Sequence, residues 1–221
     1  MITKLIFLDI DGVLNSHQHY YTKNLLGYPE EDPRKDLCMT AVCMLCKILE
    51  EHPDCKIVIS STWRLSYLKN DKHISCIFDP VPHDGLRKLL KDRTIDATPC
   101  LRGDVRVGVK DEFKSRFRGE EIQLWLDTNK KKLSPELTFV ILDDDSDMSY
   151  LYNHFIKIDG YVGLTYKDAI KAINQLKTPR ERRLAETSEL ARQLYCEAFS
   201  LGDEALLASI KEVRNIVKNT H

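Results

Sequence analysis

The sequence predicts an α/β fold in which helices cover both faces of a parallel sheet. Two observations predict it: short apolar runs of strand length recur along the chain, and longer segments with one apolar face lie between them. Such alternation is typical of a three-layer α/β/α arrangement around a parallel sheet. With 221 residues, the chain is long enough for one domain of this kind and an appendage.

The first predicted strand, Leu5–Leu8, is an unbroken apolar run, as expected for a central strand that is buried on both faces. Similar runs predict further strands at Lys56–Ile59, Phe139–Leu142 and Phe155–Ile158. Apolar residues at helical spacing predict helices over residues 36–51, 84–92, 118–126 and 166–176.

Two connecting segments show no clear periodicity. Residues 16–35 are polar and aromatic, and we expect a loop or small flap in which His17 and the tyrosines either contact substrate or have no chemical role. This segment is too short for a folded cap domain, so a small cap or none is expected. Residues 95–109 contain Pro99, Gly103 and Gly108, and we expect an irregular specificity region there.

The composition changes after Thr178 and Pro179. Residues 180–221 carry two helical patterns separated by Gly202 and Asp203, which predict a helical hairpin. We therefore expect a domain over residues 1–177 and an appendage over residues 178–221. Because each helix has an apolar stripe on one side only, the hairpin is expected to contact the core, a protein partner or a second copy of the chain.

Charge gives no general indication of a partner, because 33 Lys and Arg residues balance 34 Asp and Glu residues. Locally, residues 86–118 hold ten basic and five acidic residues, which suits either an anionic substrate or a solvated loop. No apolar run approaches the length of a membrane span, and the N-terminus lacks a secretory pattern. We expect no membrane contact and a cytoplasmic location.

Seven cysteines raise the question of a metal site, since Cys38, Cys43 and Cys46 lie within nine residues. They fall within the apolar pattern of a predicted helix, and no matching cluster of histidine or cysteine follows. Buried helix cysteines therefore explain them better than zinc does.

Two carboxylates follow the first strand, where ligands of open α/β sheets bind. Asp9 and Asp11 are two residues apart, and Gly12 allows the chain to turn sharply after them. The Asp9 side chain, the Asp11 side chain and the Asp11 carbonyl can then face one small volume. Two crowded acids require a hard cation, although a plain polar turn is the alternative.

Polar groups also follow two other strands. Ser60 comes directly after Lys56–Ile59, and its hydroxyl can donate a hydrogen bond to a phosphoryl oxygen. Asp143, Asp144 and Asp145 follow Phe139–Leu142 and repel each other unless they are solvated or bound to a cation. Together with the first pair, they predict an oxygen-rich Mg²⁺ site.

Four strings carry a family resemblance: FLDIDGVLN at 7–15, ISSTWR at 59–64, RGEEIQLWL at 118–126 and VILDDDSDM at 140–148, followed by Gly163, Leu164 and Thr165. They resemble the haloacid dehalogenase (HAD) superfamily and, over about residues 1–177, the HAD domain of Swiss Army Knife RNA repair proteins. The resemblance implies a Rossmann-like three-layer fold. The long 16–35 loop, the 93–117 segment and the C-terminal hairpin depart from that pattern.

The resemblance implies a Mg²⁺-dependent phosphatase that forms an aspartyl-phosphate. Asp9 would be the nucleophile and Asp11 the general acid and base, with Ser60 at the second motif. Arg118 would be the site cation, although Lys110, Lys114 and Arg116 lie nearby. The metal is expected at Asp9, Asp11, Asp143 and Asp144. Substrate contacts are expected from Gly12, Asn15, Ser61 and Arg64.

The resemblance and the basic 86–118 segment suggest the phosphate of a nucleic-acid end or of a nucleotide as the substrate. A phosphoprotein is the second possibility, since a site without a large cap can admit macromolecules. A non-catalytic adaptor on the same scaffold is the third. The intact set of carboxylates argues against the adaptor.

Overall fold

The computed structural model describes residues 1–27, 37–70, 72–101 and 117–201. The chain divides into two compact units, residues 1–176 and 177–221. Of the second unit, the structure describes one helix, α7 (Pro179–Leu201). The second helix of the predicted hairpin lies outside the described residues.

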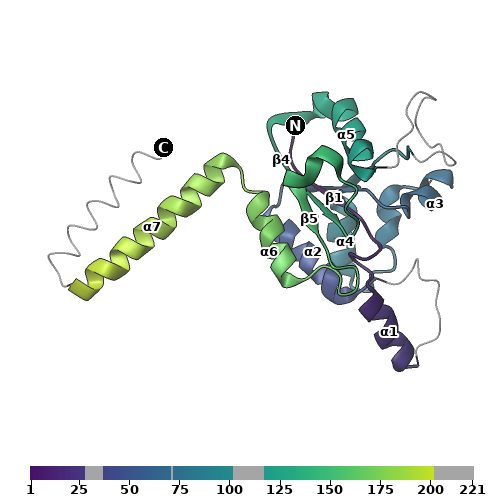
Figure 1. Cartoon of the computed structure of the whole chain (residues 1–221), viewed down its shortest axis with the longest axis horizontal. Helices are drawn as coiled ribbons and strands as arrows, with labels where there is room; N and C mark the ends of the chain where they lie inside the picture. The colour runs from purple at the N-terminus through teal and green to yellow at the C-terminus, as the bar shows by residue number, and fades with distance from the viewer. Residues whose placement is uncertain (28–36, 71, 102–116, 202–221) are drawn as a thin grey trace. The chain divides into compact units, whose positions relative to one another are not determined.

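The first unit is built on a five-stranded sheet in the order β3-β2-β1-β4-β5. Every pair of neighbouring strands is parallel, and β1 lies in the centre (Figure 1). The strands are β1 (Ile2–Leu8), β2 (Lys56–Ile59), β3 (Thr94–Ala97), β4 (Leu133–Asp143) and β5 (Phe155–Lys157). The predicted parallel α/β class is confirmed.

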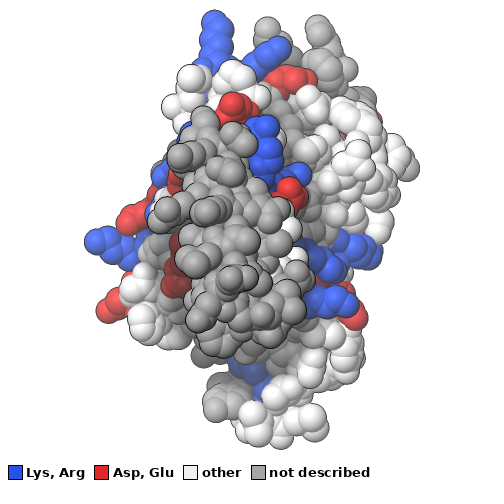
Figure 2. Space-filling model, turned by 90° about the vertical axis from the view of Figure 1, so that its left-hand side faces the viewer, with Lys and Arg blue, Asp and Glu red and all other residues white. Residues whose placement is uncertain are grey.

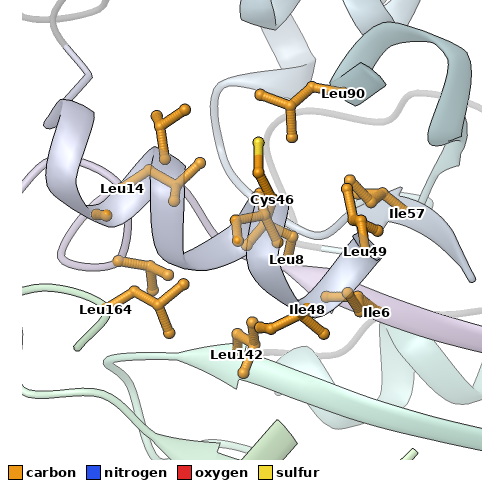
Figure 3. Packing of buried hydrophobic residues seen from close by; sticks show 14 of the residues in the cluster. Ile6, Leu8, Leu14, Cys46, Ile48, Leu49, Ile57, Leu90, Leu142 and Leu164 are labelled. Atoms are coloured by element: carbon orange, nitrogen blue, oxygen red, sulfur yellow. The ribbon is translucent and has the colours of Figure 1, made fainter. Parts of the chain in front are cut away.

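Successive residues of β1 enter two different hydrophobic cores, because side chains alternate across a strand. Ile6 and Leu8 pack on one face with apolar residues of α2 (Met39–Glu51) and α4 (Asp84–Arg93) (Figure 3). Apolar residues of α6 (Tyr166–Gln175) belong to the same core. Leu5 and Phe7 pack on the other face, against α5 (Arg118–Asn129). The predicted three layers are therefore present.

The Phe7 ring shows how closely the second core is filled. It meets the rings of Trp125 and Phe139 edge to face, at centroid distances of 5.5 and 5.7 Å. This packing fixes the central strand, whose C-terminal end carries the first carboxylate.

Two predicted irregular segments contain regular structure. Residues 17–25 form α1 (His17–Leu25), whose N-terminus is capped by the Ser16 hydroxyl, yet none of its residues is buried. The strand β3 (Thr94–Ala97) overlaps the start of the segment predicted to be irregular and lies at the sheet edge, where partial burial leaves only a weak apolar pattern. Within these two segments, residues 28–35 and 102–109 lie outside the described residues.

A further helix, α3 (Arg64–Lys69), directly follows the Ser-rich end of β2 and was not predicted. Short 3-10 turns cover Ile74–Phe78, Lys130–Lys132 and Ser149–His154. None of the helices in the described ranges is long and apolar enough to cross a membrane. Figure 2 shows basic and acidic side chains interspersed among the described residues in view.

Candidate active site

The C-terminal ends of three neighbouring strands bring the predicted polar residues together. The backbone N–H of Asp9, after β1, donates to the carbonyl of Leu142 in β4 at 3.0 Å. The N–H of Ser60, after β2, donates to the carbonyl of Leu8 in β1 at 2.8 Å. Parallel pairing in register therefore places the ends of β1, β2 and β4 at one edge of the sheet.

Three carboxylates gather at this edge. Asp9, Asp143 and Asp144 each offer an oxygen atom, and these atoms lie within 4.8 Å of one another. Asp9 and Asp143 are buried, with 5% and 0% exposure, and Asp144 is half-buried. This is the one group of three metal-ligating side chains in the described part of the chain, so the cysteines form no such cluster there.

The electrostatics of the cluster favour a cation. Burial raises the pKa of the Asp9 carboxyl, while the Arg118 guanidinium and hydrogen bonds from the Ser61 hydroxyl and the Ile10 N–H oppose the rise. Burial, and then the charge of Asp9, raise the pKa of Asp143 to about 8. Carboxylate oxygens are the ligands that Mg²⁺ prefers, and a divalent ion would stabilise the ionised carboxylates against both their burial and their mutual repulsion.

Two glycines form a slot around Asp144. A Cβ atom on Gly12 would lie 2.2 Å from Oδ2 of Asp144, and one on Gly160 would lie 2.4 Å from the same oxygen. Gly12 also has a φ of +69°, which a residue with a side chain rarely adopts. Gly12, predicted to contact substrate, thus makes room for a carboxylate of the cluster. Gly160 does the same, although no feature of the sequence pointed to it.

We expect Gly160→Ala to weaken Mg²⁺ binding at least about tenfold, roughly 1.4 kcal/mol, because the new methyl group displaces the Asp144 carboxylate. Calorimetric titration of the metal-free protein measures the change. Gly85→Ala is the matched control, since a Cβ there would meet only the side chain of His83. Equal affinity in Gly160→Ala and the wild type would show that Asp144 does not contact the ion.

Arg118 lies beside the cluster at the start of α5. It is buried, with Nη2 3.5 Å from Oδ2 of Asp9 and Nε 3.6 Å from Oδ2 of Asp143. Its backbone N–H donates to the Asp147 carboxylate at 3.1 Å, and a Cβ on the following glycine would lie 2.1 Å from the carbonyl oxygen of Met148, so the helix start is closely packed. The other candidate cations, Lys110, Lys114 and Arg116, lie outside the described residues.

The Arg118 guanidinium retains bonding capacity. Its Nε and Nη1 are buried and have no hydrogen-bond partner among the described residues. Burial lowers the pKa of Arg118, but Asp9 and Asp143 outweigh that effect and raise it, so the group stays charged. Buried, unpaired N–H donors next to a carboxylate suit the oxygens of a bound anion.

The Asp11 side chain does not join the carboxylate cluster, so a metal ligand from Asp11 would have to be its backbone carbonyl. Its Oδ1 accepts hydrogen bonds from the indole N–H of Trp63, at 2.9 Å, and from Nδ2 of Asn15, at 3.1 Å. Asp11 is exposed, whereas Trp63 and Asn15 are buried. Asn15, predicted to contact substrate, thus supports Asp11 in this structure.

The two adjacent serines face different neighbours. Ser60 is fully buried, and its hydroxyl accepts from the Thr98 hydroxyl at 3.4 Å. The Ser61 hydroxyl hydrogen-bonds to Asp9 and accepts from the Trp63 N–H at 3.4 Å. The hydroxyl beside the predicted nucleophile therefore belongs to Ser61 rather than to Ser60, because consecutive residues point to opposite sides of an extended chain.

Arg64 is not placed to contact a substrate, in contrast to our expectation. It is 3% exposed, and its Nη2 pairs with Oε2 of Glu121 at 2.7 Å. Its Nε donates to the carbonyl of Thr98 at 2.8 Å, and Nη2 also reaches the carbonyl of Pro99 at 3.1 Å. Oε1 of Glu121 in turn accepts from the N–H of Leu101 at 2.9 Å. Arg64, the first residue of α3, therefore links this helix to the segment after β3 and to α5.

We expect the metal-free protein to lose stability as the pH rises from about 4 to about 8. The folded-state pKa of Asp143 is raised to about 8. Asp143 therefore makes its full contribution to the free energy of unfolding below the ordinary pKa of an Asp, and this contribution is lost as the pH rises through the raised value. One pKa unit corresponds to about 1.4 kcal/mol, so the free energy of unfolding should fall by several kcal/mol over this range. Thermal melts of wild type and Asp143→Asn across this range measure the difference.

Added Mg²⁺ should reverse this loss at high pH, because it favours the ionised carboxylates. The Asp143→Asn protein should show a shallower pH dependence than the wild type. Identical pH profiles for the two proteins would contradict the assignment of the shift to Asp143.

Comparison with known proteins adds one match. Residues 5–169 match the family described as the HAD domain in Swiss Army Knife RNA repair proteins. This range includes the carboxylate cluster, Arg118 and the Ser-rich end of β2. No curated protein and no solved structure matches the chain.

Proposed function

Because the chain belongs to the family of HAD domains in Swiss Army Knife RNA repair proteins, a family of phosphatase-type hydrolases, we propose that it is a Mg²⁺-dependent phosphatase that forms an aspartyl-phosphate on Asp9. The observation that carries the proposal is the meeting of Asp9 with two further carboxylates and with the unpaired N–H groups of buried Arg118. An adaptor protein has no need for so many desolvated charges in one place.

In the first half of the reaction, a carboxylate oxygen of Asp9 attacks phosphorus and the bond from phosphorus to the leaving oxygen breaks. Asp11, in its protonated form, gives its proton to that oxygen. The Ser61 hydroxyl and the Ile10 N–H hold the Asp9 carboxylate in place. The free N–H groups of Arg118 bind phosphoryl oxygens and offset the negative charge that would otherwise repel the nucleophile.

In the second half, water attacks phosphorus and the bond to Asp9 breaks. Asp11, now a carboxylate, takes a proton from the water, and inorganic phosphate leaves with Asp9 and Asp11 restored. Mg²⁺, when bound, would neutralise charge on the phosphoryl group and its nucleophile. Asp9, Asp143 and Asp144 would hold the ion through side chains, and Asp11 would contribute its carbonyl.

A groove of about 500 Å³ next to Asp11 is where we place the leaving group. Besides Asp11, it is lined by Thr62, Trp63, Leu65, Ser66, Lys69 and Asn70. Hydroxyl and amide groups and an exposed lysine suit a sugar and a further phosphate, which supports the phosphate of a nucleotide or of a nucleic-acid end as the leading substrate.

The test is phosphate release with Mg²⁺ from phosphorylated RNA and DNA ends, nucleotides, phosphosugars, phosphopeptides and a generic aryl phosphate. Asp9→Asn is the control for a contaminating phosphatase. Hydrolysis of nucleotides or nucleic-acid ends with the highest kcat/KM supports the proposal, whereas a preference for phosphopeptides would assign a phosphoprotein substrate. If no phosphomonoester is turned over, the phosphatase proposal fails.

We also propose that the unit of residues 177–221 contacts a protein partner or a second copy of the chain. On α7, Leu184 and Leu190 are 37% and 45% exposed, although such side chains favour burial. We expect a chain truncated after Lys177 to remain folded and to hydrolyse an aryl phosphate, but to lose any self-association that light scattering detects in the full chain. An insoluble or inactive truncated protein would place this unit within the catalytic core instead.

A further inference from the structure

The buried side chains of Trp63 and Asn15 both donate hydrogen bonds to one oxygen of the exposed Asp11 carboxylate, which lines the groove. Oδ1 of Asp11 accepts from the indole N–H of Trp63 at 2.9 Å and from the amide of Asn15 at 3.1 Å. The described residues leave the second oxygen, Oδ2, without a hydrogen-bond partner. One oxygen is thus held by the protein and the other remains available to a ligand.

Both donors are themselves held in place. Trp63 is 6% exposed, and its backbone N–H donates to the Ser61 hydroxyl, which also bonds to Asp9. Asn15 is 3% exposed, and its backbone carbonyl oxygen accepts a hydrogen bond from the N–H of Gly12 at 2.8 Å, which closes the turn after Asp11. Of the two donors to Asp11, Trp63 is therefore connected to Asp9 through Ser61, and Asn15 is connected to the turn at Gly12.

A general acid acts only when it lies within hydrogen-bond distance of the leaving oxygen. An exposed Asp side chain ordinarily samples several rotamers, and holding it in one removes an entropic cost from each reaction cycle. The same indole also lines the groove in which we place the leaving group. The indole thus fixes the acid and borders the space that the acid must reach.

We propose that Trp63 and Asn15 are positioning residues that hold Asp11 for proton transfer to the leaving group, with Trp63 the principal one. The proposal rests on the phosphatase function proposed above. A buried indole N–H needs an acceptor in any case, so a purely structural bond is the competing explanation. The chain contains a second bond of the same chemistry that separates the two explanations.

That second bond joins Trp125 to Asp96. The Trp125 indole is 4% exposed, and its N–H donates to Oδ2 of Asp96 at 2.7 Å. Trp125 lies in α5, in the hydrophobic core that contains Phe7, and it does not line the groove. Trp125→Phe therefore removes the same bond, from a tryptophan to a carboxylate, away from Asp11.

The experiment measures kcat/KM of wild type, Trp63→Phe and Trp125→Phe for a series of phosphomonoesters whose leaving groups range from activated phenols to alkyl alcohols. General acid catalysis contributes about 10²–10⁴-fold and is needed most by poor leaving groups. We expect Trp63→Phe to lose about 10- to 100-fold on alkyl phosphates and only a few-fold on the most activated aryl phosphate. Trp125→Phe should keep the wild-type dependence on the leaving group.

A uniform loss across the series in Trp63→Phe, or the same change in Trp125→Phe, would overturn the proposal. If Trp63→Phe does not fold, Asn15→Ala removes the other donor and is judged by the same dependence. A wild-type protein that hydrolyses no ester in the series would instead refute the phosphatase function itself, so the two failures are distinguishable.

Discussion

Replacing Asp9 by Asn should abolish phosphate release without destabilising the metal-free protein. An amide has nearly the shape of a carboxylate, but it cannot act as the nucleophile, and we expect kcat to fall by at least about 10³-fold. The Ile10 N–H and the Ser61 hydroxyl can still bond to the amide oxygen. The loss should therefore be one of chemistry rather than of folding.

The expected stability follows from the buried charges. Burial raises the pKa of both carboxyls, and the charge of Asp9 raises the pKa of Asp143 further, so removing the Asp9 charge relieves repulsion. Arg118 keeps its contact with Asp143. We expect the melting temperature of metal-free Asp9→Asn to equal or exceed that of the wild type.

Phosphate release at saturating substrate and thermal melts in chelator measure the two effects. Asp96→Asn is a suitable control, because it makes the same substitution at a carboxylate that bonds to Trp125 rather than to the site. Appreciable turnover by Asp9→Asn would rule out a covalent intermediate on this residue.

Replacing Arg64 by Met should unfold a large fraction of the protein at temperatures that the wild type tolerates. The substitution leaves the Glu121 carboxylate buried without its partner and removes the donors to the carbonyls of Thr98 and Pro99. Breaking a buried ion pair costs about 3–5 kcal/mol. For a unit of this size, the melting temperature should fall by about 10 °C.

The double variant Arg64→Met with Glu121→Met should recover part of that loss, because two apolar side chains avoid the unpaired charge. Chemical denaturation of the two single variants and the double variant measures the coupling. Below its melting transition, Arg64→Met should bind substrate with nearly the wild-type KM. A large rise in KM with little loss of stability would restore the substrate-binding role that the sequence suggested.

Arg64 illustrates which parts of the site the sequence predicts. Asp9 and Asp143 could be placed because each directly follows an apolar run in the sequence, and parallel strands end at a common edge. The partner of a long, flexible side chain depends instead on tertiary packing. Glu121, which decides the role of Arg64, is 57 residues away. It lies in α5, between β3 and β4, whereas Arg64 begins α3, between β2 and β3.

The neighbours of Ser60 and Ser61 could not be predicted for a more local reason. Adjacent residues after a strand point to opposite sides, and a one-residue difference in where the strand ends exchanges their neighbours. The sequence likewise gave no sign of Gly160, because a glycine in a loop has many ordinary explanations and its role depends on the approach of Asp144.

The slot formed by Gly12 and Gly160 has a consequence for ion selectivity. Asp144 is confined between two backbones that leave no space for a side chain, so its carboxylate cannot swing outward to enlarge the coordination sphere. Mg²⁺ requires short bonds of about 2.1 Å in a near-ideal octahedron, whereas Ca²⁺ takes more oxygens at about 2.3–2.6 Å. We therefore expect the protein to bind Mg²⁺ in preference to Ca²⁺, because the two backbones hold the Asp144 carboxylate at a position that the longer Ca²⁺ bonds would require it to leave.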